Sequence, residues 1–357
     1  MKPTRPLALA WVDQSPFYQA GLAGYSDTAM RLVARRHGCP YCVTEAMLDQ
    51  FLLAGGKGLR AAELNEADHP IAGQLMGSHP ADIAAGAKVL VQLGYDVIDV
   101  NLACPVKKIK KKARGGHLLS QPADAIAILD AVKQAVGDDR PISVKLRRAY
   151  DDSAASQDAF HRIFQALIAL DYDAVTVHSR TVEQKYLGPG HRPFLGELVQ
   201  QYKADHPNLL IGASGDIWQA QDIFDTIGQT HVDMVSVARG CIGNPWIFTQ
   251  ARAIQGQVPA QPPTIFEQRQ VLLEHFELSV AQHGQSLAGR MMRKFGIRFA
   301  RHHRDHDTIK QRFIAVNNLD DWHAVLADFY AIDGPGVATL SALPTEAIAS
   351  CDSPACD

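Results

Sequence analysis

The stretch ADIAAGAKVLVQLGYDVIDVNLA, residues 81–103, contains the two patterns that decide the fold. Its first part, 81–95, spaces apolar residues as a helix does, and its second part, 96–103, is a short apolar run typical of a buried strand. Such runs recur along the chain with helical patterns between them. The predicted strands are 17–21, 41–45, 70–77, 96–103, 141–147, 173–180, 208–215 and 232–240. Eight strand–helix units within residues 1–253 predict an α/β fold, a closed (β/α)8 TIM barrel. A doubly wound open sheet is the alternative, which periodicity alone does not exclude.

The chain changes character after residue 253. Three prolines in IQGQVPAQPPT, residues 254–264, predict a linker. Helical patterns then fill residues 265–330 and predict a small C-terminal all-helical domain. Residues 331–357 hold four acidic residues and no Lys or Arg, so we expect a disordered acidic tail.

Composition excludes several classes of protein. The 357 residues are 46% apolar and 20% charged, as in ordinary globular proteins. No stretch approaches the roughly 18 uninterrupted apolar residues of a membrane helix, and the N-terminus lacks the apolar core of a signal peptide. Six cysteines do not make a disulfide framework in a chain of this length. We therefore expect a cytoplasmic protein with no membrane partner.

Basic residues gather in two places, although the net charge is −3. Residues 101–123 contain six basic residues and no acid, and residues 290–312 contain eight basic and two acidic residues. Two basic patches on a near-neutral body indicate a polyanionic partner. The alternative for either patch is an ordinary solvated helix face.

Polar residues stand at the ends of the predicted strands. They are Glu45, Gln74, Asn101, Lys145, His178, Ser214 and Arg239. In a (β/α)8 barrel the carboxyl ends of the strands meet at one mouth, where active sites lie. We therefore expect these side chains to converge, although any one of them alone could serve a structural hydrogen bond.

The last two strand ends carry glycine ahead of a predicted helix, in ASGDI (213–217) and ARGCIGNP (238–245). Backbone N–H groups at such turns bind phosphate, and these two loops are the usual phosphate site of the barrel. Lys145 in the same mouth could form a Schiff base or place positive charge beside an anionic cofactor such as a reduced flavin. His178 could donate a hydrogen bond to the same region.

Cys104 lies between Asn101 and Pro105, just beyond a strand end. A thiol there is a candidate nucleophile or proton donor, and its ordinary pKa of about 8.5 suits a general acid. Cys39 and Cys42 form a lone CxxC pair, which is weak evidence for a metal site. We predict no metal.

These motifs resemble those of the tRNA-dihydrouridine synthases, flavin enzymes that reduce uridine in RNA. The resemblance runs from about residue 19 to residue 330 and rests on DVNLACPVKKIKKKARGGHLL (99–119), VKLR (144–147), VHSRTVEQKYLG (177–188), SGDI (214–217) and ARGCIGNPWIF (238–248). It implies an FMN-dependent barrel followed by a helical RNA-binding domain, with NADPH as the reductant of the flavin. The chain departs from the family pattern at Gly21 and Leu22, where proline and methionine are usual, and its subfamily stays unassigned.

The resemblance also implies roles for individual residues. Cys104 is expected to protonate C5 of a flipped-out uracil whose C6 receives hydride from the flavin. Residues expected at the flavin are Gly21, Leu22 and Ala23 against it, Gln74, Lys145 and His178 at its ring, and Ser214, Gly215, Asp216, Ala238 and Arg239 at its phosphate arm. Residues expected at the substrate or the RNA are Asn101, Lys107, Lys108, Arg180, Arg293, Lys294, Arg298 and Arg301. We expect tRNA as the partner of a monomeric enzyme.

Three other functions remain open at this stage. The first is another FMN-dependent barrel that reduces a free pyrimidine or a similar small enone. The second is a Schiff-base lyase built on Lys145, which needs neither flavin nor RNA. The third is a non-catalytic RNA-binding module.

Overall fold

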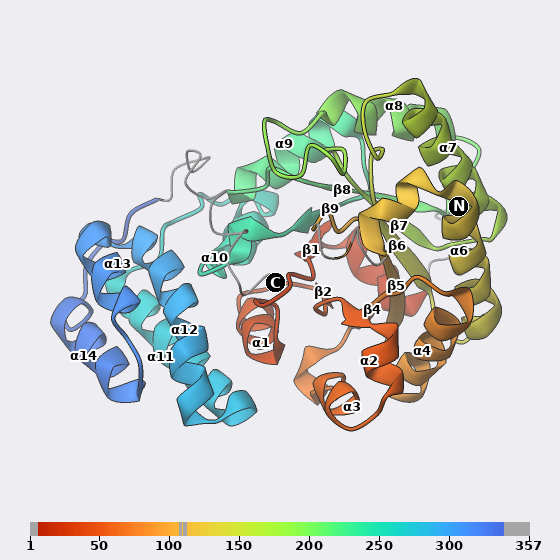
Figure 1. Cartoon of the computed structure of the whole chain (residues 1–357). Helices are drawn as coiled ribbons and strands as arrows, with labels where there is room; N and C mark the ends of the chain where they lie inside the picture. Colours follow the sequence, from red (N-terminus) through yellow and green to blue (C-terminus); the bar gives the residue numbers. More distant parts are fainter. Residues whose placement is uncertain (1–5, 107–108, 110–112, 339–357) are drawn as a thin grey trace.

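The computed structural model describes residues 6–106, 109 and 113–338 and contains a closed parallel barrel with helices around it (Figure 1). Within these residues eight strands form the ring: β1 Phe17–Gln19, β2 Cys42–Val43, β4 Ile71–Met76, β5 Val97–Leu102, β6 Ile142–Arg147, β7 Ala174–His178, β8 Leu210–Ser214 and β9 Met234–Val237. The order is β2-β1-β9-β8-β7-β6-β5-β4, and pairing of β2 with β4 closes the ring. The TIM-barrel prediction is therefore confirmed. A further two-residue strand, β3 Met47–Leu48, pairs with β4 and was not predicted.

Helices cover the outside of the barrel. They are α1 Thr28–Arg36, α2 Asp49–Leu53, α3 Lys57–Ala61, α4 Pro80–Gln92, α6 Pro122–Val136, α7 Ala154–Ala169, α8 Arg192–Tyr202, α9 Ala220–Thr230 and α10 Trp246–Gln255. The side chains of Asp27 and Ser153 cap α1 and α7 by accepting backbone N–H groups of the first turn. Alternate strand residues such as Ile98 and Val100 are fully buried against this helical layer.

The barrel interior changes from apolar to polar along the strands. At the amino end, a 3-10 helix, η1 Leu7–Asp13, plugs the ring. The Trp11 ring stacks on Tyr41 with centroids 4.7 Å apart, and its edge meets Tyr18. Further along, interior positions are taken by polar residues such as Asp99 and Ser143. The carboxyl end is thus the end equipped for chemistry.

In the described residues up to 338, four helices follow the barrel: α11 Ile265–His283, α12 Gln285–Phe299, α13 His306–Ile314 and α14 Leu319–Phe329, with a 3-10 turn η5 Ala300–His302 between α12 and α13. Thr264 and Glu267 form a capping box that starts α11. Figure 1 shows this helical region beside α1 and α10 of the barrel. Trp246 of α10 packs edge-on against Phe299 and His302, so the two parts share an apolar contact.

Part of the predicted tail has ordered contacts. The Gly334 carbonyl accepts the N–H of Ile265, and the N–H of Val337 donates to the His302 carbonyl. Residues 331–338 therefore pack on the helical region, contrary to the expected disorder, because their backbone supplies partners for α11 and η5. Residues 339–357 lie outside the described residues. No helix in the described part of the chain is long and apolar enough to span a membrane.

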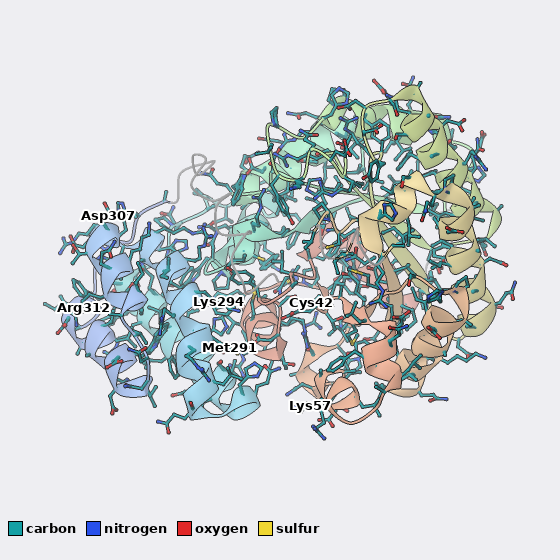
Figure 2. All side chains as sticks on the ribbon, in the orientation of Figure 1. Cys42, Lys57, Met291, Lys294, Asp307 and Arg312 are labelled. Carbon is teal, nitrogen blue, oxygen red and sulfur yellow. The ribbon has the colours of Figure 1, made fainter. Side chains whose placement is uncertain are left out.

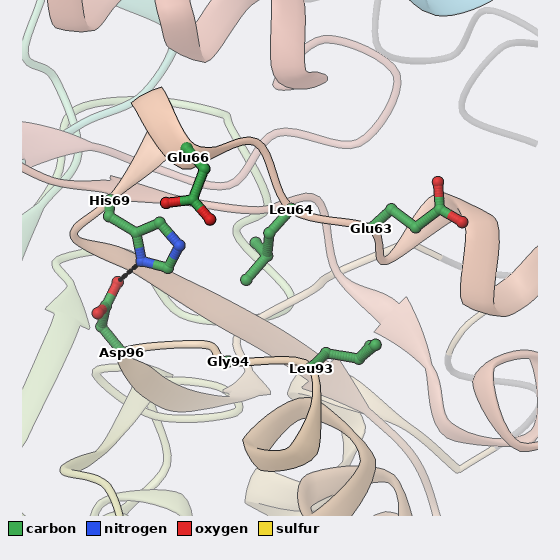
Figure 3. Close-up of a pocket in the computed structure, with 7 residues that line it drawn as sticks. All are labelled: Glu63, Leu64, Glu66, His69, Leu93, Gly94 and Asp96. Carbon is green, nitrogen blue, oxygen red and sulfur yellow. Dashed lines mark hydrogen bonds and ion pairs between the residues drawn. The ribbon is translucent and has the colours of Figure 1, made fainter.

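An open cavity of about 810 Å³ lies at the amino end of β4 and β5, away from the mouth (Figure 3). His69 and Asp96 in its wall precede these strands, and their side chains bond at 2.7 Å (Nδ1 to Oδ2). The same Asp96 oxygen accepts the N–H of Ile71. These contacts join the starts of β4 and β5, so His69 and Asp96 have a structural role in the cavity wall.

The Trp11 plug gives a stability prediction. Trp11→Ala removes a large buried ring and should lower the free energy of unfolding by about 3–5 kcal/mol in chemical denaturation. Leu7→Ala, in the same 3-10 helix but with Leu7 91% exposed, is the matched control and should change it by less than about 0.5 kcal/mol. Equal effects of the two substitutions would show that η1 does not plug the barrel.

Candidate functional site

Five of the predicted strand-end side chains converge inside the carboxyl end of the barrel. They are Gln74, Asn101, Lys145, His178 and Ser214, from five successive strands. Asn101 Nδ2 donates to Gln74 Oε1 at 2.6 Å, and Lys145 Nζ donates to Ser214 Oγ at 3.3 Å. Parallel register makes this possible because it sets Asn101 opposite Lys145 and His178 opposite Ser214. The structure thus joins them in one mouth.

Cys104 lies half-buried at the rim of this mouth, in the loop after β5. Its backbone N–H donates to Asn101 Oδ1 at 3.1 Å, and its carbonyl accepts the N–H of Gly116 at 3.0 Å. A Cβ on Gly116 would lie 2.9 Å from both the Cys104 carbonyl oxygen and a Val182 methyl group. Gly115 has a φ of +57°, and a Cβ there would lie 3.0 Å from the Cys104 Cβ. The two glycines are therefore needed for the loop to hold this thiol.

The basic run after Cys104 is only partly described. Lys107 and Lys108, predicted RNA contacts, lie outside the described residues. Arg114, which ends the basic run, is 5% exposed and does not face the rim. Its guanidinium donates to Gln50 Oε1 at 3.0 Å and lies 3.7 Å from Asp49, because α2 covers it. Arg114 is thus an anchor of the loop.

Burial lowers the pKa values of both Lys145 and His178. Desolvation lowers the pKa of Lys145 to about 8, with the carboxylate of Asp99 acting in the opposite direction. Burial also lowers the pKa of His178 well below its usual range, and four cations lower it further: Arg147, Lys145, Arg180 and Arg239. The N–H of Arg180 donates to His178 Nδ1 at 3.1 Å. A neutral ring therefore carries its proton on Nε2, as a donor.

Arg147 and Arg239 both lie against the ring of Tyr186, and Arg239 also lies against that of Trp218. The guanidinium of Arg239 lies 4.6 Å from the Trp218 ring centroid and 5.1 Å from that of Tyr186. Arg147 lies 5.6 Å from the Tyr186 ring and donates from Nε to the Ala103 carbonyl at 2.8 Å. Cation–π contacts fix both guanidinium groups while leaving the region positively charged. The mouth is thus suited to an anionic ligand.

The turn after β8 has the backbone expected of a phosphate loop. Gly215 and Asp216 have φ values of +112° and +56°, a conformation rare for a residue with a side chain. The carboxylate of Asp216 is held by Arg180 Nη2 at 2.7 and 2.9 Å and accepts the N–H of Gly190 at 2.8 Å. These contacts maintain the strained turn.

The structure places the side chain of Arg180 inside the protein. It was expected to contact the substrate or the RNA, but it is 3% exposed. Its guanidinium is held by Asp216 and by the Gly188 carbonyl, so it supports the turn from behind. Its Nη1 is buried and has no hydrogen-bond partner among the described residues.

The loop between β1 and α1 lies at the same mouth. A Cβ on Gly21 would come 2.1 Å from the Thr44 carbonyl oxygen, so glycine is required at this departure from the family pattern. The N–H of Leu22 donates to Ser26 Oγ at 2.7 Å. The N–H of Gly24 donates to Glu45 Oε2 at 2.7 Å, which gives the predicted strand-end carboxylate a role as an anchor. Burial raises the pKa of Glu45.

Several of the predicted RNA contacts of the helical region form hydrogen bonds within the protein. Lys294 Nζ donates to the Gly24 carbonyl, and Arg301 donates to the carbonyl oxygens of Gly240 and Ile242 at 3.2 and 3.0 Å. These two half-buried side chains join the helical region to the barrel loops, and their assignment to RNA stays a prediction. Figure 2 shows Lys294 at this junction and Arg312 on the far side. Arg293 donates to the Val316 carbonyl at 2.9 Å.

Several functional-site residues escaped the sequence prediction. Asp99 and Ser143 lie one layer below the mouth, and Arg147 holds the Cys104 loop through Ala103. The signal was the two-residue period of strands, which sets Asp99 on the face of Asn101 and Arg147 on the face of Lys145.

The CxxC pair has no metal partners in the described region. Cys39 and Cys42 are buried, with their sulfur atoms 3.9 Å apart. Among residues 6–106, 109 and 113–338, no three His, Cys, Asp or Glu side chains are grouped to hold a metal ion. Cys351 and Cys356 lie outside the described residues.

Known proteins resemble this chain in sequence and in fold. The chain is 31% identical over 281 residues to tRNA-dihydrouridine synthase B of Pseudomonas aeruginosa, covering 77% of this chain and 80% of that protein. It is 29% identical over 316 residues to a probable tRNA-dihydrouridine synthase of Treponema pallidum, covering 87% and 91%. Among solved structures, histamine dehydrogenase from Rhizobium sp. 4-9 shares the fold at a TM-score of 0.50 and 13% identity, over 72% of this chain and 49% of that one.

The model of one enzyme family, described as Dihydrouridine synthase (Dus), matches residues 18–330, which include nearly the whole barrel and the four following helices. The match includes Cys104, the paired glycines after it and the cationic strand ends. This chain is an oxidoreductase that belongs to the dihydrouridine synthase family.

Proposed function

We propose that this chain reduces the C5=C6 bond of a uridine in tRNA, using FMN at the barrel mouth and NADPH as the source of electrons. One observation carries the proposal: a half-buried thiol, Cys104, is fixed at the rim of a mouth lined by buried cations and a neutral histidine. A thiol there can deliver a proton, and the cations can hold an anionic cofactor. The family and the names of its members supply the substrate.

The described residues fit FMN on chemical grounds. The strained turn at Gly215 and Asp216, with Ser214, and the turn at Ala238 and Arg239 would hold the phosphate arm. Gln74, Lys145 and His178 would bind the ring, and Gly21, Leu22 and Ala23 would lie against it. The unpartnered buried Nη1 of Arg180 adds a donor behind the phosphate turn. A reduced FMN held there would be the source of the hydride that C6 of the uracil receives.

The residues of the chain supply the other half of the reduction. The Cys104 thiol gives its proton to C5, and Asn101 holds the backbone from which that thiol extends. His178, neutral with a proton on Nε2, donates a hydrogen bond in the mouth, and Lys145 provides positive charge. A uridine within folded RNA must leave its stack to reach this mouth.

Helices α11–α14 are the proposed RNA-binding domain of a monomeric cytoplasmic enzyme. On α12, Arg290 is exposed and Arg298 is half-buried. Arg304, just before α13, and Lys310, within α13, are also exposed. With Lys107 and Lys108 of the Cys104 loop, they would give the RNA backbone contacts on both sides of the flipped base.

The experiment that tests this function compares RNA from cells with and without the chain by mass spectrometry. We expect one or more uridines to carry two additional hydrogen atoms only when the chain is present. RNA of identical mass in the two strains would refute uridine reduction in RNA. FMN in the purified protein together with unchanged RNA would favour a reductase of a free pyrimidine or another small enone.

Removing the proton donor should separate the two halves of the reaction. Cys104→Ala is expected to bind FMN and oxidise NADPH like the wild type but to reduce uridine at least about a hundredfold more slowly, because a positioned general acid is absent. The rates are measured by RNA mass spectrometry and NADPH absorbance. Cys39→Ala, which removes a buried thiol elsewhere, is the control. Uridine reduction by Cys104→Ala at the wild-type rate would exclude this role.

The charge of Lys145 predicts a pH dependence of cofactor binding. Its pKa of about 8 in the protein means that the ammonium is present below pH 8 and is lost as the pH rises through it. We therefore expect the dissociation constant of FMN, measured by fluorescence titration of the flavin-free protein, to rise between pH 7 and pH 9. Lys145→Met should bind more weakly and show no such rise. The same rise in the variant would assign it to another group.

Charge reversal on the helical region tests the RNA surface. Arg290→Glu with Lys310→Glu should weaken tRNA binding and reduce the slope of log K against log salt concentration by about 1 for each RNA phosphate that the variant no longer neutralises. Arg162→Glu, on α7 of the barrel exterior, is the matched control. If the two proteins bind tRNA with equal affinity and equal salt slopes, α12 and α13 do not face the RNA.

A further inference from the structure

A carboxylate lies inside the barrel directly below the mouth, and the proposed reaction gives it no task. Asp99 is 6% exposed, on the interior face of β5. Its Oδ1 accepts from Ser143 Oγ at 2.5 Å and its Oδ2 from Gln74 Nε2 at 2.7 Å. Burying an acid costs free energy unless its partners compensate. We therefore looked for a role that explains an acid in the barrel core.

The hydrogen bonds of Asp99 belong to a chain that leads to the thiol. Gln74 bonds to the carboxylate through Nε2, and its Oε1 accepts from Asn101 Nδ2 at 2.6 Å. Asn101 Oδ1 in turn accepts the backbone N–H groups of Ala103 and Cys104 at 3.0 and 3.1 Å. Three side chains from two adjacent strands thus connect the barrel core to the backbone of Cys104.

This chain of bonds has a fixed direction. A carboxylate oxygen can only accept, so the Gln74 amide must turn its nitrogen down and its oxygen up. That oxygen can only accept, so Asn101 must present its nitrogen to it and its oxygen to the loop. The backbone N–H groups at the far end can only donate, which agrees. Any flipped amide would set two donors or two acceptors face to face.

We propose that Asp99 is a positioning residue that, by orienting the amides of Gln74 and Asn101, fixes the backbone of Cys104 at the rim of the mouth. The functional importance of that position rests on the proposed role of Cys104 as proton donor. We call the hydrogen-bonded series Asp99–Gln74–Asn101 the relay. Its proposed effect is on the order of the Cys104 loop, and that order can be measured without RNA and without cofactor.

The test compares substitutions of Asp99 itself with a substitution of Ser143, the hydrogen-bond partner that does not lead to Cys104. Asp99→Ala leaves Gln74 Nε2 without its acceptor. Asp99→Asn keeps the relay, because an asparagine oxygen can accept from Gln74 while its nitrogen donates to Ser143 Oγ. Ser143→Ala is the matched control, since it removes the other hydrogen bond of the same buried carboxylate and leaves the relay intact.

The first measurement is the rate at which iodoacetamide alkylates Cys104 in the flavin-free protein, followed by mass spectrometry of its peptide. Asp99→Ala should speed alkylation about fivefold to tenfold, because the loop loses its anchor. Asp99→Asn and Ser143→Ala should stay within about twofold of the wild type. Equal rates in Asp99→Ala and Ser143→Ala would overturn the relay.

The second measurement uses the reaction and keeps the two proposals apart. In the enzyme saturated with FMN, the ratio of the uridine reduction rate to the NADPH oxidation rate should fall about tenfold to a hundredfold in Asp99→Ala. The misplaced thiol lowers only uridine reduction, whereas altered contacts of Lys145 and Gln74 with the flavin affect both rates. A relay visible in alkylation without any uridine reduction by the wild type would refute the proposed function and leave the positioning role standing.

A second pair of variants, which exchanges the hydrogen-bond donor and acceptor between positions 74 and 99, tests the relay if Asp99→Ala does not fold. Gln74→Glu sets two acceptors against each other at the Asp99 end, which should loosen the loop and speed alkylation. Adding Asp99→Asn supplies a donor again and should return the rate to within about twofold of the wild type. Failure of the double variant to slow the alkylation of the single one would contradict the proposed direction of the relay.

Discussion

The pairing of β2 with β4 is the constraint on which the site depends. These strands meet through only two register pairs, Cys42 with Ile71 and Val43 with Ala72, and they turn an open parallel sheet into a ring. Closure brings the carboxyl ends of all the strands to one mouth. The direct pairing of β1 with β2 then sets Glu45, just after β2, within reach of Gly24 in the loop after β1. Without this pairing, β2 would lie at one edge of an open sheet and β4, with β3, at the other.

The mouth is held from below and from the side. From below, interior polar side chains, including the carboxylate of Asp99, order the residues that hold the Cys104 loop. From the side, Lys294 of the helical region bonds the Gly24 carbonyl, and the Asp27 carboxylate bonds His283 of α11 at 2.9 Å. The loop expected to touch the flavin is therefore also the loop on which the helical region rests. The proposed RNA-binding helices and the proposed cofactor loop are thus in direct contact.

The sequence was sufficient to predict the barrel and the convergence of polar strand ends at its mouth. Eight apolar runs became eight strands because buried parallel strands are continuous apolar segments, and the polar residues ending them lie at the mouth because parallel register aligns those ends. The short strand β3 was missed because two residues leave no periodic pattern.

The sequence did not predict which way the basic side chains point. Arg180, Arg301 and Arg114 carry the charge expected of RNA contacts, yet each is bound by carbonyl or carboxylate oxygens or by a neighbouring amide within the protein. Charge in a one-dimensional pattern indicates a cation but not its partner. Which basic residues face solvent depends on α2, the turn after β8 and the contact between the helical region and the barrel.

The most direct test of this account is a crystal structure of the protein with FMN and a uridine-containing RNA. We predict the cofactor phosphate at the turns of residues 214–216 and 238–239, the flavin ring beside Gln74, Lys145 and His178, and the uracil between that ring and Cys104 Sγ. A flavin bound at another site, or a uracil whose C5 lies out of reach of Cys104, would contradict it.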